Sequence, residues 1–170
     1  IIPLRESVGR VLARDIVAPI DLPPFTNSAV DGYAVRHADL LSDRPTRLPL
    51  HGKAFAGHVS DPLPPGMAAR VFTGAMLPDG ADSVQMQEDC EERAGWVVMR
   101  PGIGFGANRR LAGEDLARGS RALSAGRRLM PPDIGLVAAL GLERLPVRAP
   151  LNVALFSTGD ELVEPPALLS

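Results

Sequence analysis

The chain has 170 residues, of which 18 are Lys or Arg and 20 are Asp or Glu, so its formal net charge is −2. This balance excludes a protein built to coat nucleic acid or an acidic membrane, and aromatic residues, at 4%, are too few for base-stacking platforms. A single cysteine excludes an internal disulfide framework, no apolar run reaches the roughly 18–20 residues that span a bilayer, and the lack of a signal peptide favours a cytoplasmic location.

Glycine and proline, with 17 residues each, predict many tight turns between short strands. Residues 10–17 are β-branched and apolar, which predicts a first strand that the prolines at 19, 23 and 24 end. A turn-rich loop follows over 24–32, and its Asp-Gly pair is typical of a tight turn before a strand at 33–35.

The next stretch, 37–50, is polar and contains prolines, so we expect a surface connection there. Short apolar or alternating runs then predict strands at 53–57, 68–73, 83–87 and 95–100. The spacing of these strands is typical of a small all-β barrel or sandwich over residues 25–112.

A helix is predicted over 130–140, because proline is tolerated in a first turn and Gly141 suits the C-terminal end. An edge strand is expected at 143–148. The run 151–156 is nearly all apolar, as in doubly covered parallel strands, and polar residues follow it at 157–161. We therefore expect an α/β domain to begin near residue 150 and to be cut off by the chain's end.

Two short polar motifs are candidate site residues. Asp31 is either a turn residue or a carboxylate that faces an anion-bound metal, and the Asp-Gly pair alone favours the turn. Thr73 comes before Gly74 at the end of a strand, where a hydroxyl and backbone amides can bind an oxyanion. Taken alone, such a motif is more often an ordinary strand end.

The segment 108–115 is the densest polar cluster. Its two arginines suit oxyanions such as phosphate or molybdate, which guanidinium groups bind in a bidentate way. Glu114 and Asp115 offer oxygen ligands for a divalent cation. A solvated loop with internal ion pairs is the alternative, and both remain open. Asp160 and Glu161 are candidate ligands and also suit the start of a helix, and both interpretations can hold together.

Several other chemistries are disfavoured. The glycines at 102, 104 and 106 have the wrong spacing for a dinucleotide-binding fingerprint, so we interpret them as residues of a flexible loop. Cys90 lies among four acidic residues, which disfavour a reactive thiolate. The three histidines have no zinc-ligand spacing.

Taken together, the motifs resemble the MoeA/gephyrin family of molybdopterin molybdenumtransferases. The similarity includes Asp31-Gly-Tyr-Ala, Thr73-Gly-Ala and Ser157-Thr-Gly-Asp-Glu, with the block from Asn108 to Asp115 between the last two. These blocks occur in order along nearly the whole chain, which makes the resemblance specific. Four positions depart from the family's common residues: Thr26, Val30, Met76 and Arg109.

The resemblance implies insertion of molybdate into adenylylated molybdopterin with release of AMP, assisted by Mg²⁺. It implies catalytic roles for Asp31, Thr73, Arg110 and Asp115, of which the two aspartates, together with Glu161, are expected metal ligands. Glu161 is also expected to bind substrate, together with Ser28, Gly74 and Asn108.

The implied fold is mainly β with some α. It comprises a discontinuous linker domain at 1–24 and 113–148, an inserted β-rich domain at 25–112, and the first strand of a molybdopterin-binding domain at 149–170. The family's members are homodimers, and we expect this truncated chain to be inactive by itself. A non-catalytic dimeric scaffold that binds peptides by strand addition is the main alternative. A carboxylate-pair hydrolase is a more remote one.

Overall fold

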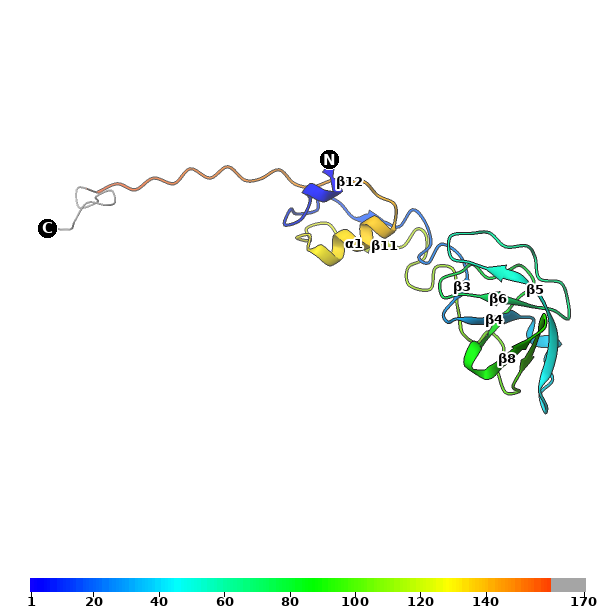
Figure 1. The fold of residues 1–170 in the computed structure, drawn as a ribbon. Coiled ribbons are helices and arrows are strands. Elements are labelled where there is room, and N and C mark those ends of the chain that lie inside the picture. Colours follow the sequence, from blue (N-terminus) through cyan, green and yellow to red (C-terminus); the bar gives the residue numbers. More distant parts are fainter. Residues whose placement is uncertain (160–170) are drawn as a thin grey trace.

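The computed structural model describes residues 1–159. They form a helix-bearing part, a larger part built on a curled sheet, and an extended tail at the C-terminal side (Figure 1). Most elements are strands and only one α-helix occurs in this range, so the expected class, mainly β with some α, is confirmed. No helix within residues 1–159 has the length and apolar character needed to cross a membrane.

The helix-bearing part joins residues from the beginning of the chain to residues beyond 116. Short antiparallel pairs connect the two, β1 with β12 and β2 with β11. The predicted strand at 10–17 is shorter than expected, because its first residues make only isolated bridges at Val11 and Leu12. The elements are β1 (Ile2–Pro3), η1 (Leu4–Glu6), β2 (Ile16–Val17), β11 (Arg121–Leu123), α1 (Pro131–Ala139) and β12 (Arg144–Leu145).

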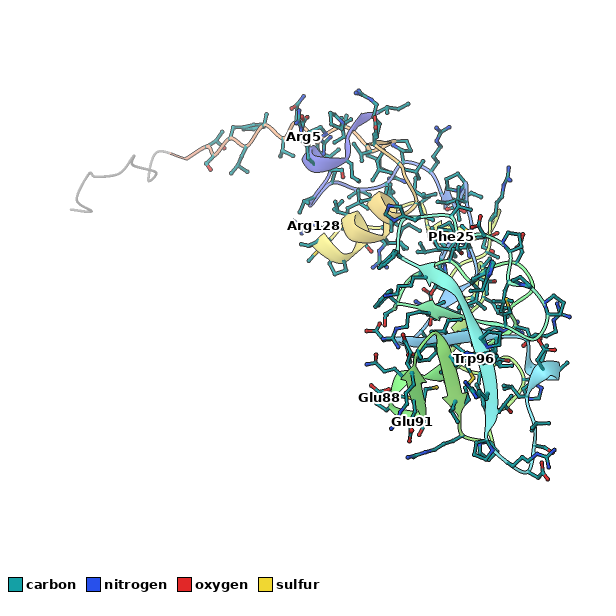
Figure 2. The ribbon with its side chains drawn as sticks, turned by 45° about the vertical axis from the view of Figure 1, so that its right-hand side comes forward. Arg5, Phe25, Glu88, Glu91, Trp96 and Arg128 are labelled. Carbon is teal, nitrogen blue, oxygen red and sulfur yellow. The ribbon has the colours of Figure 1, made fainter. Side chains whose placement is uncertain are left out.

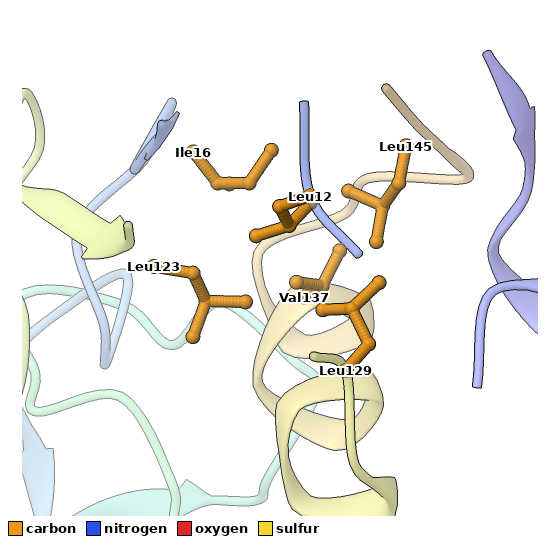
Figure 3. Close-up of a cluster of buried hydrophobic side chains, with 6 residues drawn as sticks. All are labelled: Leu12, Ile16, Leu123, Leu129, Val137 and Leu145. Atoms are coloured by element: carbon orange, nitrogen blue, oxygen red, sulfur yellow. The ribbon is translucent and has the colours of Figure 1, made fainter. Parts of the chain in front are cut away.

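This part has its own apolar core, and α1 packs against it (Figure 3). The predicted helix is confirmed, since α1 begins with two prolines and the backbone at Gly141, with φ of 73°, ends it. The Asp133 carboxylate accepts a 2.9 Å hydrogen bond from the N–H of Met130, which caps the first turn. The buried core side chains are Leu12, Ile16, Leu123, Leu129, Val137 and Leu145.

The larger part contains a six-stranded sheet in the order β7-β4-β6-β5-β9-β8. All neighbouring strands are antiparallel except β5 and β6. A two-stranded ladder, β3 with β10, lies outside this sheet. The elements are β3 (Asn27–Ser28), β4 (Gly32–Val35), η2 (His37–Asp39), β5 (Thr46–Ala54), β6 (Ala68–Val71), β7 (Ser83–Met86), η3 (Gln87–Asp89), β8 (Cys90–Arg93), β9 (Trp96–Met99) and β10 (Arg109–Arg110).

The expectation of a surface connection over 37–50 is wrong, because β5 begins at Thr46 and is the longest strand. Proline usually prevents ladder pairing, but Pro49 stands where β5 changes partners. Residues 46–49 pair with β9, whereas the pairs with β6 lie between Leu50 and Ala54. A strand that exchanges one neighbour for another can accommodate a residue without an N–H.

Both faces of the central strands are covered. Tyr33, Val35 and Ala68 face one apolar cluster, and Ala34 and Val71 face another. Gly32 is required where β4 meets β7, because a Cβ atom there would lie 2.1 Å from the carbonyl oxygen of Gln85. This close approach between β4 and β7 fixes the backbone directly after Asp31.

Residues 151–156, predicted as a strand, are extended but unpaired within the described range. Leu155 is 93% exposed and Phe156 is 85% exposed. A β-strand needs a neighbour to satisfy its backbone, and residues 1–159 supply none at this point. Asp160 and Glu161 lie outside the described residues, and the domain borders at 24, 112 and 148 stay a prediction.

Candidate functional site

The short strand β3 brings the three predicted motifs together. Ser28 donates its N–H to the carbonyl of Ala75 and accepts the N–H of Gly74 on its own carbonyl, both at 2.9 Å. On its other side, β3 pairs with β10, with Ser28 opposite Arg109 and Asn27 opposite Arg110. The segments around Gly74 and Arg109, about 45 and 80 residues further along the chain, therefore both contact the buried residues Asn27 and Ser28.

Asp31 and Thr73 form the first part of the site. One carboxylate oxygen of Asp31, Oδ1, accepts hydrogen bonds from the N–H and from the hydroxyl of Thr73, each at 2.8 Å. These two bonds, the backbone one foremost, hold the pKa of Asp31 below its usual range. The carboxylate is therefore ionised and held in a fixed orientation. Its other oxygen, Oδ2, has no hydrogen bond within residues 1–159.

Asn108 joins β3 to the six-stranded sheet. It has a left-handed backbone, with φ of 55°, a conformation that asparagine tolerates better than most residues. Its side-chain amide donates to the carbonyl of Val84 at 2.9 Å, and its carbonyl accepts the N–H of Ala29 at 2.9 Å. Asn108 therefore positions the loop that precedes Arg110.

Arg110 is paired with both acidic residues of its own loop. Its Nε donates to Glu114 at 2.7 Å and its Nη2 donates to Asp115 at 2.6 Å, with all three side chains between 38% and 51% exposed. These bonds raise the pKa of Arg110, and the one to Arg110 lowers the pKa of Glu114. The internal ion pairs expected of a solvated loop are therefore present. The same loop also adjoins the other candidate residues.

The loop of Asp115 is tied back to the residues before β3. The N–H of Asp115 donates to the carbonyl of Leu22 at 3.0 Å. The hydroxyl of Thr26 accepts the N–H of Ala112 at 3.3 Å, and the Thr26 carbonyl accepts the N–H of Leu77 at 3.1 Å. Thr26, one of the departures from the family pattern, thus has a local role in joining two segments of the site.

The carboxylates of Asp31 and Asp115 lie on separate segments on either side of β3, paired with Thr73 and Arg110 respectively. Mg²⁺ is usually bound by one or two carboxylates plus waters and substrate phosphates, so either residue alone could hold such an ion only in part. No group of three or more His, Cys, Asp or Glu side chains between residues 1 and 159 is close enough to hold a metal alone. Glu161, the third expected ligand, lies outside the described residues.

Arg70 is a neighbour of the site that sequence reasoning missed. Its guanidinium carbon lies 4.9 Å from the centre of the Tyr33 ring and 5.2 Å from that of Phe72. Arg70 also donates to the side-chain oxygen of Gln87. The backbone N–H of Gln87 in turn donates to the Asp31 carbonyl at 3.1 Å. An arginine inside a predicted strand gave no signal of this role, since only the fold places it beside Asp31.

Comparisons with known proteins agree with these motifs. The family model described as MoeA N-terminal region (domain I and II) matches residues 1–141. A molybdopterin molybdenumtransferase from Synechococcus elongatus is 42% identical over 167 residues, which are 95% of this chain and 41% of that protein. One from Haemophilus influenzae is 40% identical over 163 residues, 95% of this chain and 40% of that protein.

The fold is likewise similar to solved structures. A molybdopterin biosynthesis moeA protein from Pyrococcus horikoshii OT3 has a TM-score of 0.81 and 39% identity, over 86% of this chain and 40% of that one. A second structure under that name has a TM-score of 0.88 and 37% identity, over 99% of this chain and 44% of that one. The chain thus spans about two fifths of the length of its curated relatives.

Proposed function

Because the chain belongs to the family of the MoeA N-terminal region, we propose that the protein that carries it is a molybdopterin molybdenumtransferase. Its reaction is the insertion of molybdate into adenylylated molybdopterin, with release of AMP. The names of the curated relatives support this activity. We place the reaction in molybdenum cofactor synthesis and in the cytoplasm.

The observation that carries the proposal is the meeting of three motifs on β3. Ser28 contacts the Thr73-Gly74 segment through backbone hydrogen bonds and the Arg110 segment through the β3–β10 ladder. A structural turn at Asp31 would not need the other two motifs beside it. Their convergence supports a shared site for a negatively charged reactant, because it combines fixed donors with ionised carboxylates.

Each predicted residue then has a proposed role. Arg110 binds an oxyanion of the substrate with guanidinium donors, while Glu114 and Asp115 set the orientation of that group. Thr73 holds Asp31 in place. Ser28, Gly74 and Asn108 would border the substrate and hold its neighbouring segments in place, since their own donors pair with Ala75, Ser28 and Val84.

Mg²⁺ is proposed as the assisting cation. Asp31, Asp115 and Glu161 would hold it, since carboxylate oxygens are its preferred protein ligands. When bound, the ion supplies neutralisation of the charge that develops on the leaving phosphate. The chain's own contribution is to keep Asp31 ionised and oriented through the two hydrogen bonds from Thr73.

We propose that the active protein is a homodimer and that the 170-residue chain alone is inactive. The exposed apolar residues of the tail support this proposal. Side chains such as Leu151 and Leu155, 89% and 93% exposed, are normally covered by another domain or subunit.

The function is tested by reconstitution. The full-length protein is mixed with adenylylated molybdopterin, molybdate and Mg²⁺, and then with the cofactor-free form of a molybdenum enzyme. We expect the enzyme to gain activity only when the protein and molybdate are both present. Equal activation without the protein, at low molybdate, would contradict the proposed function.

A further inference from the structure

Three strands of the curled sheet begin or end beside Asp31 and Thr73. Asp31 directly precedes β4, Thr73 lies two residues after β6, and Gln87 directly follows β7. β4 stands between the other two strands and is antiparallel to both. The register of β4 with β7 places Gln87 opposite Asp31, one residue beyond the last ladder pair, and the Gln87 N–H donates to the Asp31 carbonyl at 3.1 Å. These three strand ends therefore decide how Asp31 meets Thr73.

The side chain of Arg70 reaches across β4, from β6 to the end of β7. Arg70 stands directly opposite Tyr33 on β4, and its guanidinium carbon lies 4.9 Å from the centre of the Tyr33 ring and 5.2 Å from that of Phe72. On the far side of β4 it donates to the side-chain oxygen of Gln87. Each contacted side chain belongs to one of the three strand ends, so Arg70 joins all three.

Arg70 is a half-buried arginine whose contacts are aromatic and neutral. None of the ion pairs within residues 1–159 includes it. A planar guanidinium can lie over aromatic rings and donate hydrogen bonds in its own plane at the same time, which a lysine ammonium cannot do. These contacts use both capacities of arginine, which indicates a role in holding neighbouring segments together.

The charge of Arg70 has a smaller effect on Asp31 than its contacts have. The two hydrogen bonds from Thr73 lower the pKa of Asp31 more than the positive charge of Arg70 does. Within residues 1–159, Arg70 makes no hydrogen bond to either residue of this pair. Its influence on the site therefore passes through Gln87 and the two rings, and it concerns position more than ionisation.

We infer that Arg70 is a positioning residue: it holds Gln87 and, through the Gln87 backbone, keeps Asp31 aligned with Thr73. The inference rests on the proposed function, in which Asp31 takes part in the reaction. Partners that orient a ligating or reacting side chain typically change activity by about 10- to 100-fold when they are removed. Because Arg70 does not touch the substrate in this role, its loss should affect turnover and not substrate binding.

AMP release by the full-length protein, measured at varied substrate concentration, tests this role. Arg70→Met keeps an unbranched apolar stem but lacks the guanidinium, and Gln87→Ala removes the acceptor while its N–H remains. We expect each variant to lower kcat by about tenfold and to leave KM for adenylylated molybdopterin within about twofold. Both changes break one chain of contacts, so the double variant should lose no more activity than either single variant.

Hydrogen–deuterium exchange of the full-length protein tests the same role without turnover. The N–H groups of Thr73 and Gln87 both donate to Asp31. If Arg70 holds these segments together, both N–H groups should exchange about tenfold faster in Arg70→Met than in the wild type.

Arg47→Met is the matched control for the loss of an arginine from this sheet. Arg47 also lies over an aromatic ring, with its guanidinium carbon 4.4 Å from the centre of Trp96, but it pairs with β9 and not with the strands beside Asp31. This variant should match the wild type in kcat, in KM and in the exchange of the two N–H groups.

The inference is overturned if Arg70→Met retains the wild-type kcat and exchange rates, if its loss appears in KM instead, or if the losses of the single variants multiply in the double variant. A wild type that releases no AMP in the presence of molybdate rejects the proposed function instead. The exchange rates then still decide whether Arg70 holds Asp31 against Thr73.

Discussion

At the scale of single residues, the contributions of the backbone N–H and the hydroxyl of Thr73 can be measured separately. Both donate to Asp31 Oδ1 at 2.8 Å, but only the hydroxyl is lost in Thr73→Val. We expect AMP release by the full-length protein to fall roughly 10- to 100-fold, as when a residue that orients a ligand is removed. Thr73→Ser retains the donor and should stay near wild type. Equal rates in the two variants would contradict the positioning role.

The Cys90 thiol is predicted to react slowly with alkylating reagents in the folded protein. Burial, and next the negative charge of Asp89, raise the pKa of its thiol to about 12. The thiolate is therefore about one part in ten thousand at pH 8, too little for fast alkylation. Iodoacetamide should modify Cys90 slowly in the folded protein and rapidly in urea, as followed by mass spectrometry. Fast modification of the folded protein would refute the buried environment.

Motif similarity indicated the candidate site residues but not their mutual contacts. Arg110 and Asp115 were assigned different roles from the sequence, yet they hydrogen-bond to each other at 2.6 Å. A spacing of five residues in a loop does not determine whether two side chains meet, because that depends on the turn at Gly113. Arg70 carried no sequence signal, since its position beside Asp31 depends on which strands become neighbours.

At the scale of secondary structure, α1 offers a stabilising substitution. Gly135 lies inside the helix, and a Cβ atom there meets nothing within 4 Å. Alanine restricts the unfolded chain without a clash, so Gly135→Ala should raise the free energy of unfolding by about 1 kcal/mol in urea titrations. The same change at Gly32 should instead be strongly destabilising, because its Cβ would lie 2.1 Å from Gln85 O. Similar effects at both positions would contradict the packing described.

Asp133 makes the stability of α1 depend on pH. Its side chain is 5% exposed, and the hydrogen bonds from Arg127 hold its pKa below the ordinary 3.8. A lowered pKa means that the carboxylate stabilises the fold above the unfolded pKa and loses this effect as pH falls through the folded value. Asp133→Asn should therefore cost about 1–2 kcal/mol at pH 7, and the difference should shrink below pH 4.

Urea denaturation of wild type and Asp133→Asn at pH 7, 5 and 3 measures this effect. Asp43→Asn, at an exposed position outside the apolar clusters, is the control and should show little change at any of the three values. A destabilisation of Asp133→Asn that grew as the pH fell would have the wrong sign for a lowered pKa.

Elements with a clear period were predicted well, and those without one were missed. The strands at 33–35, 68–71, 83–86 and 96–99 and the helix are present where alternation, turns and caps indicate them. β3 and β10 have two residues each, too few for a pattern, and β5 contains a proline that favours a loop. The short strands that build the site are therefore defined by tertiary contacts and could not be predicted from a local pattern.

At the scale of the whole molecule, the chain passes between the helix-bearing part and the sheet part twice, near Leu22 and near Leu116, and Figure 2 shows the two parts from a turned view. Leu22 and Leu116 form a bridge between these crossings, and Asp115 donates to Leu22. The site thus adjoins the junction of the two parts. We expect the 170-residue chain to release no AMP when assayed at the concentration at which the full-length protein is active, and release by the chain alone would contradict the need for further protein.

The central claim is that side chains gathered around β3 act on a molybdate-dependent reaction. It is tested most directly by measuring AMP release from adenylylated molybdopterin, with and without molybdate, for full-length wild type, Asp31→Asn and Asp115→Ala. Asp43→Asn serves as the matched control. We predict molybdate-stimulated release by the wild type and the control, and a loss of about 100-fold or more in the two site variants with unchanged melting temperatures. Wild-type turnover in Asp31→Asn and Asp115→Ala would contradict the account.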